Sequence, residues 1–543
     1  MKKGIIAAVA IILLGGMTHA QEGIVYKYWV SLKDKAGSAY EITRPEAYLS
    51  PRALERRHLQ GIAIDSLDLP VSESYIQTLI DSGYVVQNKS KWLNGVTVFT
   101  PDEVSGSRLW NFPFVTDVKL CDIATVKCPV EDNTYPVVHY EPNEWRNIGD
   151  SLYGMGLTQI DQLGGIPLHK DGYQGQGLII GVCDVGFPGV DTIQPFDSLR
   201  QSGRLLASRD FVWGGEDVYS IHAHGTLVLS TMAAYLPGIY VGTAPLASYV
   251  LCRTENTLSE TPLEEYNWVA AAEYLDSLGA DIVTSSLGYF YFDSSYQSYT
   301  LEDLDGNTAP MTIASNIAFS RGMLILNAAG NDGAANPQHL NVPADAEHVL
   351  TVGATMRGGG VAPFSSHGPT ADGRTKPDVL ALGADVACFT RTGELNRVNG
   401  TSLATPIMAG MMACLWQRYP DWTPQQLCDS VRAWGNMADA VDEMGGYGIP
   451  NFGRCYPSNT VENNLTADAV SLRLYPNPAH RGSRLRLPAD RANVTIFDAL
   501  GRKVETISVS NGMMVVNTPA NGVFYVRIVL EGGNSSMVKL LVL

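Results

Sequence analysis

The most informative segment of the chain reads Asn399-Gly400-Thr401-Ser402-Leu403-Ala404-Thr405-Pro406. The apolar pattern predicts a helix over 407–419 directly after it. Ser402 then lies at the positive N-terminal end of that helix, where a developing negative charge is favoured. A serine before a helix is most often only an N-cap. Gly400 and Ala404, however, leave room for a second backbone to approach, which capping does not require.

Two motifs upstream contain further reactive side chains. Gly181-Val182-Cys183-Asp184-Val185-Gly186 ends an apolar strand in a carboxylate, and His222-Ala223-His224-Gly225-Thr226 opens a helical run. Taken singly, Asp184 fits a turn residue and His224 a structural residue at a helix start. A metallohydrolase that uses His222 and His224 is an alternative, but no third ligand follows at a suitable spacing.

The order aspartate, histidine, serine, together with the string Gly-Thr-Ser-x-Ala-x-Pro, resembles the subtilisin-like serine peptidases, the subtilase family. Ala328-Ala329-Gly330-Asn331 is similar to the family's oxyanion segment, and Ser285-Ser286-Leu287-Gly288 to the strand that binds substrate. Asn341, just before Val342-Pro343, is expected near the floor of the first specificity pocket. The resemblance therefore implies the catalytic residues Asp184, His224, Ser402 and Asn331 and the substrate-binding residues Ser286, Leu287, Gly288, Ala329, Gly330 and Asn341.

The resemblance implies a serine endopeptidase that forms an acyl-enzyme. Ser402 attacks the peptide carbonyl, His224 moves the proton, and Asp184 orients the imidazole. The chain departs from the family at Val185, where serine or threonine is usual, and at Leu227, which is bulkier than usual; neither departure removes a functional group. The alternative is a catalytically silent subtilase-fold adhesin or binding module, which would require a missing triad group.

The fold class follows from short apolar runs that alternate with helical patterns between residues 151 and 456. This alternation predicts an α/β domain, with a parallel sheet covered by helices on both faces, and function gathers at the carboxyl ends of such strands. The expected strands lie at 178–183, 249–252, 281–285, 323–327 and 349–352, and the expected helices include 263–278 and 312–320.

The flanking segments predict a multidomain precursor. The expected boundaries are a signal peptide at 1–20, a small α+β propeptide-like domain at 21–125, a linker at 126–150, the subtilisin-like peptidase domain at 151–456, a linker at 457–471 and a small β-sandwich at 472–543. A separate binding module is the alternative for the α+β domain. The tail, with Leu474-Tyr475-Pro476-Asn477-Pro478, resembles the sorting domains of type IX secretion; a carbohydrate-binding module would need an exposed aromatic platform, which is not evident.

Composition limits the partners. The formal net charge is −17, with 17% charged and 45% hydrophobic residues, which opposes binding to nucleic acid but suits a folded chain. No segment after the signal is apolar for the ~18 residues that a transmembrane helix needs. The expected partners are protein or peptide substrates and the type IX secretion machinery. The expected location is secreted or on the cell surface, after export through the periplasm of a Gram-negative bacterium.

Cysteines and metals are the remaining chemical questions. In an exported chain the eight cysteines can form disulfides. Cys121 and Cys128 are close enough for a small loop, and Cys455 can meet Cys414 or Cys428, whereas Cys183 is expected to be a buried apolar residue; the sequence leaves the connectivity open. No cofactor is required and no metal ligand set is assigned. Asp303, Asp305 and Asn307 alternate as oxygen ligands in 289–310, so a structural calcium is the alternative to a solvated loop there.

Overall fold

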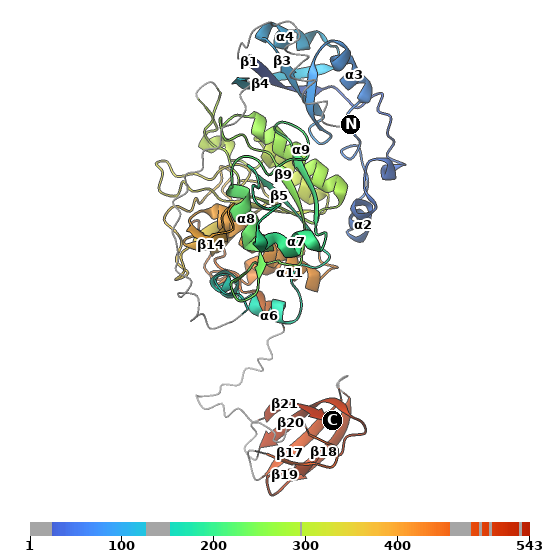
Figure 1. The fold of residues 1–543 in the computed structure, drawn as a ribbon, viewed down its shortest axis with the longest axis vertical. Coiled ribbons are helices and arrows are strands. Elements are labelled where there is room, and N and C mark those ends of the chain that lie inside the picture. The colour runs from blue at the N-terminus through green and yellow to red at the C-terminus, as the bar shows by residue number, and fades with distance from the viewer. Residues whose placement is uncertain are drawn as a thin grey trace. The chain divides into compact units, whose positions relative to one another are not determined.

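The computed structural model describes residues 24–125, 152–293, 296–456, 479–487, 491–498, 502–530 and 535–542. Its contacts divide the chain into two units, Met1–Pro457 and Ser458–Leu543, each of which is described by itself (Figure 1). The predicted signal peptide and both predicted linkers lie outside the described residues.

The first unit contains a seven-stranded sheet with the order β13-β12-β11-β10-β5-β9-β6. All neighbouring strands run parallel, and most of their side chains are buried because helices cover the sheet. β6 and β13 extend the five predicted strands at the two edges. The strands are β5 (Ile179–Asp184), β6 (Leu205–Asp210), β9 (Ser248–Arg253), β10 (Ile282–Ser285), β11 (Leu324–Ala328), β12 (Leu350–Thr355) and β13 (Val379–Leu382).

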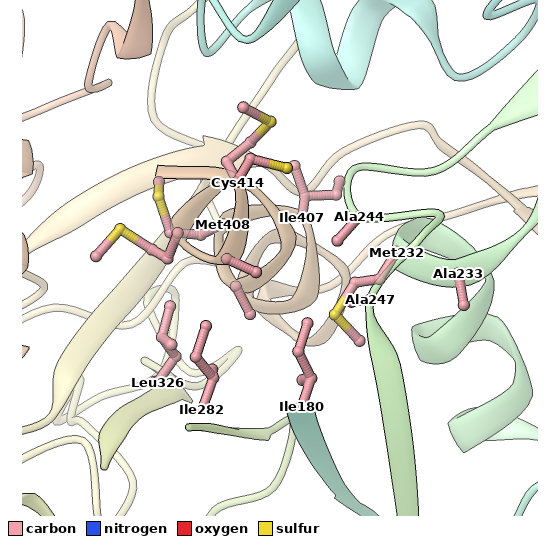
Figure 2. Close-up of a cluster of buried hydrophobic side chains, with 14 of the residues drawn as sticks. Ile180, Met232, Ala233, Ala244, Ala247, Ile282, Leu326, Ile407, Met408 and Cys414 are labelled. Atoms are coloured by element: carbon pink, nitrogen blue, oxygen red, sulfur yellow. The ribbon is translucent and has the colours of Figure 1, made fainter. Parts of the chain in front are cut away.

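Helices cover both faces of this sheet, which confirms the predicted fold class. α8 (His224–Ala233) and α11 (Thr401–Arg418) share one apolar cluster with the sheet. α9 (Leu263–Leu278) and α10 (Pro310–Ser320) share the cluster on the other face. Figure 2 shows the first cluster: side chains of α11 such as Met408 lie against the strand residues Ile180, Ile282 and Leu326.

α11 begins at Thr401, six residues before the predicted start, and includes Pro406. Proline has no N–H to donate to the carbonyl four residues earlier, which here belongs to Ser402. That carbonyl instead accepts a hydrogen bond of 2.7 Å from Ser286 Oγ. A side chain from the end of β10 therefore satisfies the backbone group that Pro406 leaves without its helical partner.

The N-terminal part of the same unit is an α+β domain, as predicted. Four antiparallel strands follow the order β2-β3-β1-β4, and their core packs with α3. A separate helix, α2, begins after Ser50, whose side chain accepts from Ala53 N. The elements are β1 (Ile24–Leu32), α2 (Pro51–Leu59), α3 (Glu73–Asp81), β2 (Val85–Ser90), β3 (Gly95–Thr100), α4 (Glu103–Ser107) and β4 (Val115–Thr125).

Smaller elements complete the first unit. They are α5 (Leu157–Asp161), α6 (Ile166–Lys170), α7 (Asp197–Gln201), β7 (Tyr235–Leu236), β8 (Tyr240–Val241), β14 (Val386–Phe389), β15 (Leu395–Val398) and α12 (Pro424–Ala433). Within the described residues, no helix has the length and apolar character needed to cross a membrane.

The second unit is all β. A four-stranded sheet β18-β17-β20-β21 and a two-stranded sheet β16-β19 enclose one apolar core, the arrangement of a small sandwich. The strands are β16 (Arg484–Arg486), β17 (Ala492–Phe497), β18 (Lys503–Val509), β19 (Met513–Val515), β20 (Gly522–Leu530) and β21 (Ser535–Val542).

The pairing of Cys455 with Cys414 or Cys428, which the sequence left open, is not formed in the structure. All three are buried free thiols, and each packs among apolar side chains in the core that covers α11. They behave as small apolar residues, which a count of cysteines cannot distinguish from bridge formers. Cys128, the expected partner of Cys121, lies outside the described residues.

Candidate active site

The candidate catalytic residues Asp184 and His224 lie at the carboxyl edge of the parallel sheet. Asp184 is the last residue of β5 and is fully buried, and His224 is the first residue of α8. His224 Nδ1 lies 2.8 Å from Asp184 Oδ1 and 3.1 Å from Oδ2. The N–H of Val185 donates to the same Oδ1 at 2.8 Å. With Nδ1 donating to the carboxylate, Nε2 of His224 is the nitrogen that can accept a proton.

The surroundings of His224 favour its protonated form. Burial alone lowers the pKa of this imidazole, but the charge of Asp184 and their hydrogen bond together outweigh burial, and the net pKa is raised above its usual 6.5. The side chain keeps 18% of its surface exposed. The group can therefore reach a substrate and form a stabilised cation.

The candidate nucleophile, Ser402, lies in the first turn of α11 and is 8% exposed. A Cβ added at Gly400 would lie 2.7 Å from Ser402 Oγ. Because that distance is shorter than side-chain contacts allow, Gly400 is needed to leave space around the hydroxyl. The expectation that Gly400 leaves room for a second backbone stays a prediction.

Asn331 is held against the segment of the candidate nucleophile. Its Oδ1 accepts hydrogen bonds from Thr401 N at 2.9 Å and from Thr401 Oγ1 at 3.1 Å. With Oδ1 bound in this way, Nδ2 is the group of this amide that can donate to a substrate oxygen. Thr401, which the sequence reasoning did not select, is the residue that fixes this orientation.

The predicted substrate-binding residues lie together. Ser286, Leu287 and Gly288 follow β10, Ala329 and Gly330 follow β11, and Asn341 links the two segments. Asn341 N donates to Ala329 O at 3.2 Å. A Cβ at Gly288 would lie 2.7 Å from Asn341 Cβ, and one at Gly330 would lie 3.0 Å from Asn341 Nδ2.

Asn341 is also fixed by polar neighbours. Its Nδ2 donates to Asp332 Oδ2 at 3.1 Å, and its Oδ1 lies 3.2 Å from His339 Nδ1. The two glycines on either side and these two contacts leave the side chain little freedom. The structure therefore places Asn341 between the two segments predicted to bind substrate.

Sequence reasoning missed a buried carboxyl group beside this site. Glu255 follows β9, and its Oε2 accepts a short hydrogen bond from the Tyr289 hydroxyl. Burial raises the pKa of Glu255 to about 8. With Val185, Glu264 and Asp293 it lines a cavity of about 350 Å³. The available signal was an acidic residue three positions after the apolar run 249–252.

Metal ligation is a separate question. Among the described residues, no three His, Cys, Asp or Glu side chains gather closely enough to hold a metal ion. The carboxylates of Asp303 and Asp305 accept hydrogen bonds from neighbours in their own turns, including Thr300 N and Asn307 N. The alternative of a structural calcium in 289–310 stays a prediction.

Comparison with known proteins identifies the family. Residues 175–448 match the family described as "Subtilase family". Residues 27–134 match the family described as "Peptidase S8 propeptide domain, Bacteroidota", and residues 473–543 match the one described as "Secretion system C-terminal sorting domain". The chain belongs to the subtilase family. The resemblance inferred from its motifs is therefore confirmed, and the two flanking matches show a propeptide domain and a secretion sorting domain.

Individual relatives agree with this assignment. Subtilisin E of Bacillus subtilis is 30% identical over 277 residues, which are 50% of this chain and 64% of that protein. Serine protease AprX of the same species is 31% identical over 288 residues, 48% of this chain and 61% of AprX. The matches thus span less than two thirds of either relative.

A solved structure supports the fold alone. The epidermin leader peptide processing serine protease of Staphylococcus aureus superposes with a TM-score of 0.52 at 16% identity, covering 79% of this chain and 96% of that one.

Proposed function

We propose that the chain is a secreted serine endopeptidase that hydrolyses peptide bonds through Asp184, His224 and Ser402. The observation that supports this most strongly is the hydrogen bond of 2.8 Å between His224 Nδ1 and the buried Asp184. A buried carboxylate that orients an imidazole is the support a general base requires.

The mechanism follows from these groups. His224 Nε2 takes the proton of Ser402 Oγ as the oxygen attacks the substrate carbonyl, and returns it to the leaving amine when the acyl-enzyme forms. Asp184 stabilises the imidazolium. Asn331 Nδ2 and the backbone N–H of Ser402 donate to the oxyanion, and the loss of one such donor costs about 3–4 kcal/mol of barrier in comparable sites. Water then releases the acid by the same proton transfers.

The flanking domains complete the proposal. The propeptide domain at 27–134 covers the peptidase domain until cleavage occurs between them. The sorting domain at 473–543 directs the chain through the type IX machinery, after it has crossed the periplasm of a Gram-negative bacterium. The substrates are proteins or peptides.

Replacement of the nucleophile tests the proposal. Ser402→Ala should lower kcat on a denatured protein substrate by about a millionfold and leave the circular dichroism spectrum unchanged. The matched control is Ser202→Ala, which removes an exposed hydroxyl at the end of α7 and should keep full activity. Equal hydrolysis by Ser402→Ala and the parent would contradict the serine mechanism. No hydrolysis by the processed parent would favour the alternative, a silent binding module.

A further inference from the structure

A buried amide side chain lies where two strands of the parallel sheet part. The register between β10 and β11 ends with the pair Ser285 and Asn327. Beyond this pair the chain continues as 286–288 after β10 and as 329–330 after β11, the two segments predicted to bind substrate. We call residues 286–288 the pocket wall. Asn327 thus occupies the last paired position before the pocket wall leaves the sheet.

Asn327 faces the apolar side of the sheet that α9 and α10 cover. Side chains two residues apart on a strand share a face, and Ile325 belongs to the apolar cluster on that side. The side chain of Asn327 is fully buried. An amide in such surroundings is unfavourable unless it forms hydrogen bonds, so its partners indicate what it does.

The Asn327 amide links the pocket wall to β11. Nδ2 donates to Leu287 O at 2.9 Å and to Ala328 O at 2.9 Å. One NH2 group therefore bridges a carbonyl of the pocket wall and a carbonyl of β11. Because the register of the two strands has ended, this side chain fixes their separation at the point where they part.

The other half of the same amide gains nothing from its position. Among the described residues, Asn327 Oδ1 has no hydrogen-bond partner, and a buried acceptor without a partner is unfavourable. A leucine of similar volume would remove this unpaired oxygen, but it would also deprive the Leu287 carbonyl of its donor. The arrangement therefore fixes Leu287 at some expense of stability.

The pocket wall is also fixed at the candidate nucleophile. Ser286 Oγ donates to Ser402 O at 2.7 Å. The pocket wall is thus held at two points, by the first turn of α11 and by Asn327 of β11. Asp184 and His224 lie on β5 and α8, so a shift of Leu287 alters the pocket wall without moving the elements that carry these two residues.

Other polar side chains in the same register have different partners. Thr351 pairs with Asn327 in the sheet and donates through Oγ1 to Ala344 O at 2.7 Å. Ser285 accepts from Trp268 Nε1 of α9 at 3.1 Å. Of these three side chains, Asn327 is the one whose hydrogen bond reaches a residue predicted to bind substrate.

We propose that Asn327 is a positioning residue for the first specificity pocket: its amide holds Leu287 O at a fixed distance from β11 and so aligns the pocket wall with the substrate. This inference rests on the proposed endopeptidase function. Asn327 acts on the binding of the substrate chain beside the cleaved bond, and the proton transfers between Ser402 and His224 do not involve it. Loss of the amide therefore weakens reaction with peptides and spares reaction with a reagent too small to contact the pocket wall.

Two substrates separate these effects in the processed chain. The ester p-nitrophenyl acetate acylates a serine without contacting the pocket wall, whereas an uncharged peptide substrate must bind along it. Asn327→Leu should lower kcat/KM for the peptide at least tenfold, mainly through KM, and leave kcat/KM for the ester within about twofold.

Tyr249→Phe is the matched control. It also removes one donor from a fully buried side chain to a backbone carbonyl, in this case the 2.8 Å hydrogen bond to Ala244 O. It should leave kcat/KM for both substrates within about twofold of the parent. A peptide loss in Asn327→Leu no larger than that in Tyr249→Phe would overturn the proposal, as would equal losses with peptide and ester.

Asn327→Asp tests whether the side chain acts as a donor. Burial raises the pKa of a carboxyl group, and its protonated form donates to Leu287 O whereas its ionised form has no proton to donate. The measured quantity is the ratio of kcat/KM for the peptide to kcat/KM for the ester, in which the titration of His224 cancels. In Asn327→Asp this ratio should be near the parental value at pH 5 and fall at least tenfold by pH 9, while the parental ratio stays within about threefold.

The outcomes distinguish this inference from the proposed function. A ratio in Asn327→Asp that does not change with pH would show that Asn327 does not act as a donor and would overturn the inference alone. A processed parent that reacts neither with the ester nor with a serine-directed phosphonate would refute the proposed function, and this inference with it.

Discussion

The pKa of His224 is set by opposing effects of burial and of charge. Burial disfavours its cation, and Asp184 at 2.8 Å favours it more strongly, so the pKa is raised. A base whose cation is stabilised accepts a proton readily, but it must first be neutral. The pH profile of the reaction therefore reports the Asp184 interaction directly.

The acid limb of kcat/KM should have its midpoint above pH 6.5, because protonated His224 cannot accept the Ser402 proton. Asp184→Asn should move that midpoint to lower pH, since only the charge of Glu255 then opposes the effect of burial on His224, and it should lower kcat by about 10⁴. The measurement is a pH series with a small peptide substrate and the processed chain. Asp191→Asn, at an exposed position, should keep the parental profile; an unchanged midpoint in Asp184→Asn would refute the assignment of His224 as the base.

Asn341 occupies the space between Gly288 and Gly330. Asn341→Gly should therefore enlarge the first specificity pocket and raise kcat/KM for large aromatic residues at the cleaved bond by at least tenfold relative to small ones. A panel of peptides that differ only at that residue measures the change. Asn341→Asp keeps the volume and should not favour aromatic residues; an unaltered preference in Asn341→Gly would place the pocket elsewhere.

At the scale of elements, α9 is the helix of the peptidase domain that also contacts the propeptide domain. Its Asp276 lies 2.5 Å from Arg56, 2.9 Å from Arg57 and 2.9 Å from Lys91 of the propeptide domain. The carboxylate of Glu273 accepts from Lys91 N at 2.7 Å, Trp92 N at 2.9 Å and Ser90 Oγ. Burial raises the pKa of Glu273 to about 7, although the charge of Lys91 opposes the rise. The pKa of Asp276, by contrast, is lowered to about 2 by its three cations against the effect of burial.

These shifts give propeptide binding a pH dependence. When the propeptide domain leaves, the pKa of Glu273 returns toward its usual 4.5. Binding of the propeptide domain therefore takes up a proton between about pH 4.5 and 7. Its affinity weakens as the pH rises through 7. After the chain between the two domains is cut, we expect the Kd of the propeptide domain for the peptidase domain to rise at least tenfold from pH 5 to pH 8. Glu273→Gln should remove this pH dependence. Glu265→Gln is the control. The pKa of Glu265 is also about 7, but its hydrogen-bond partners Tyr299 and Met311 lie in the peptidase domain, and the charge of Lys119 from the propeptide domain lowers its pKa. A slope that persists in Glu273→Gln would assign it to another group.

Elements were predictable where the pattern was local. The predicted strand at 178–183 and the predicted helix at 263–278 match β5 and α9 closely. Five or more apolar residues in a row, or a full helical period, leave little choice of secondary structure. The start of α11 was not predictable, since a proline normally argues against a helix interior. Only the tertiary contact from Ser286 to the Ser402 carbonyl makes that start favourable.

The residues of the candidate site, too, could be predicted from the sequence only where the signal was local. Asp184, His224 and Asn331 were identified from motifs, because their residue types and order are specific. Glu255 and Thr401 act through contacts between segments far apart in the sequence, such as the bond from Tyr289 to Glu255. No periodicity or spacing encodes such contacts.

At the scale of the whole molecule, the division after Pro457 separates the peptidase and its propeptide domain from the sorting domain. Each unit has its own apolar core, so each should fold alone. A chain that ends at residue 457 should hydrolyse a peptide substrate with kcat/KM within about twofold of the full chain, and should no longer leave the cell. Activity assays and fractionation of a Bacteroidota host measure the two effects. Loss of activity in a folded truncated chain would show that the sorting domain contributes to catalysis.

The contacts of the α2 arginines with the C-terminal ends of α9 and α10 could not be predicted from the sequence at this scale. Arg52, Arg56 and Arg57 look like the basic face of an ordinary surface helix, and Asp276 like one acid among many in an acidic domain. These residues pair only because the two domains are in contact, and no local sequence pattern reveals that contact.

The seven cysteines of the described residues, all buried as free thiols, have a consequence for the order of events outside the cytoplasm. Burial raises the pKa of Cys121, Cys388 and Cys428 to about 12, and a thiol that does not ionise is a poor substrate for oxidants. These three thiols are thus poorly reactive in the folded protein, whereas unfolding exposes them to oxidants. On the proposed export route, folding before contact with oxidants therefore keeps these buried thiols reduced.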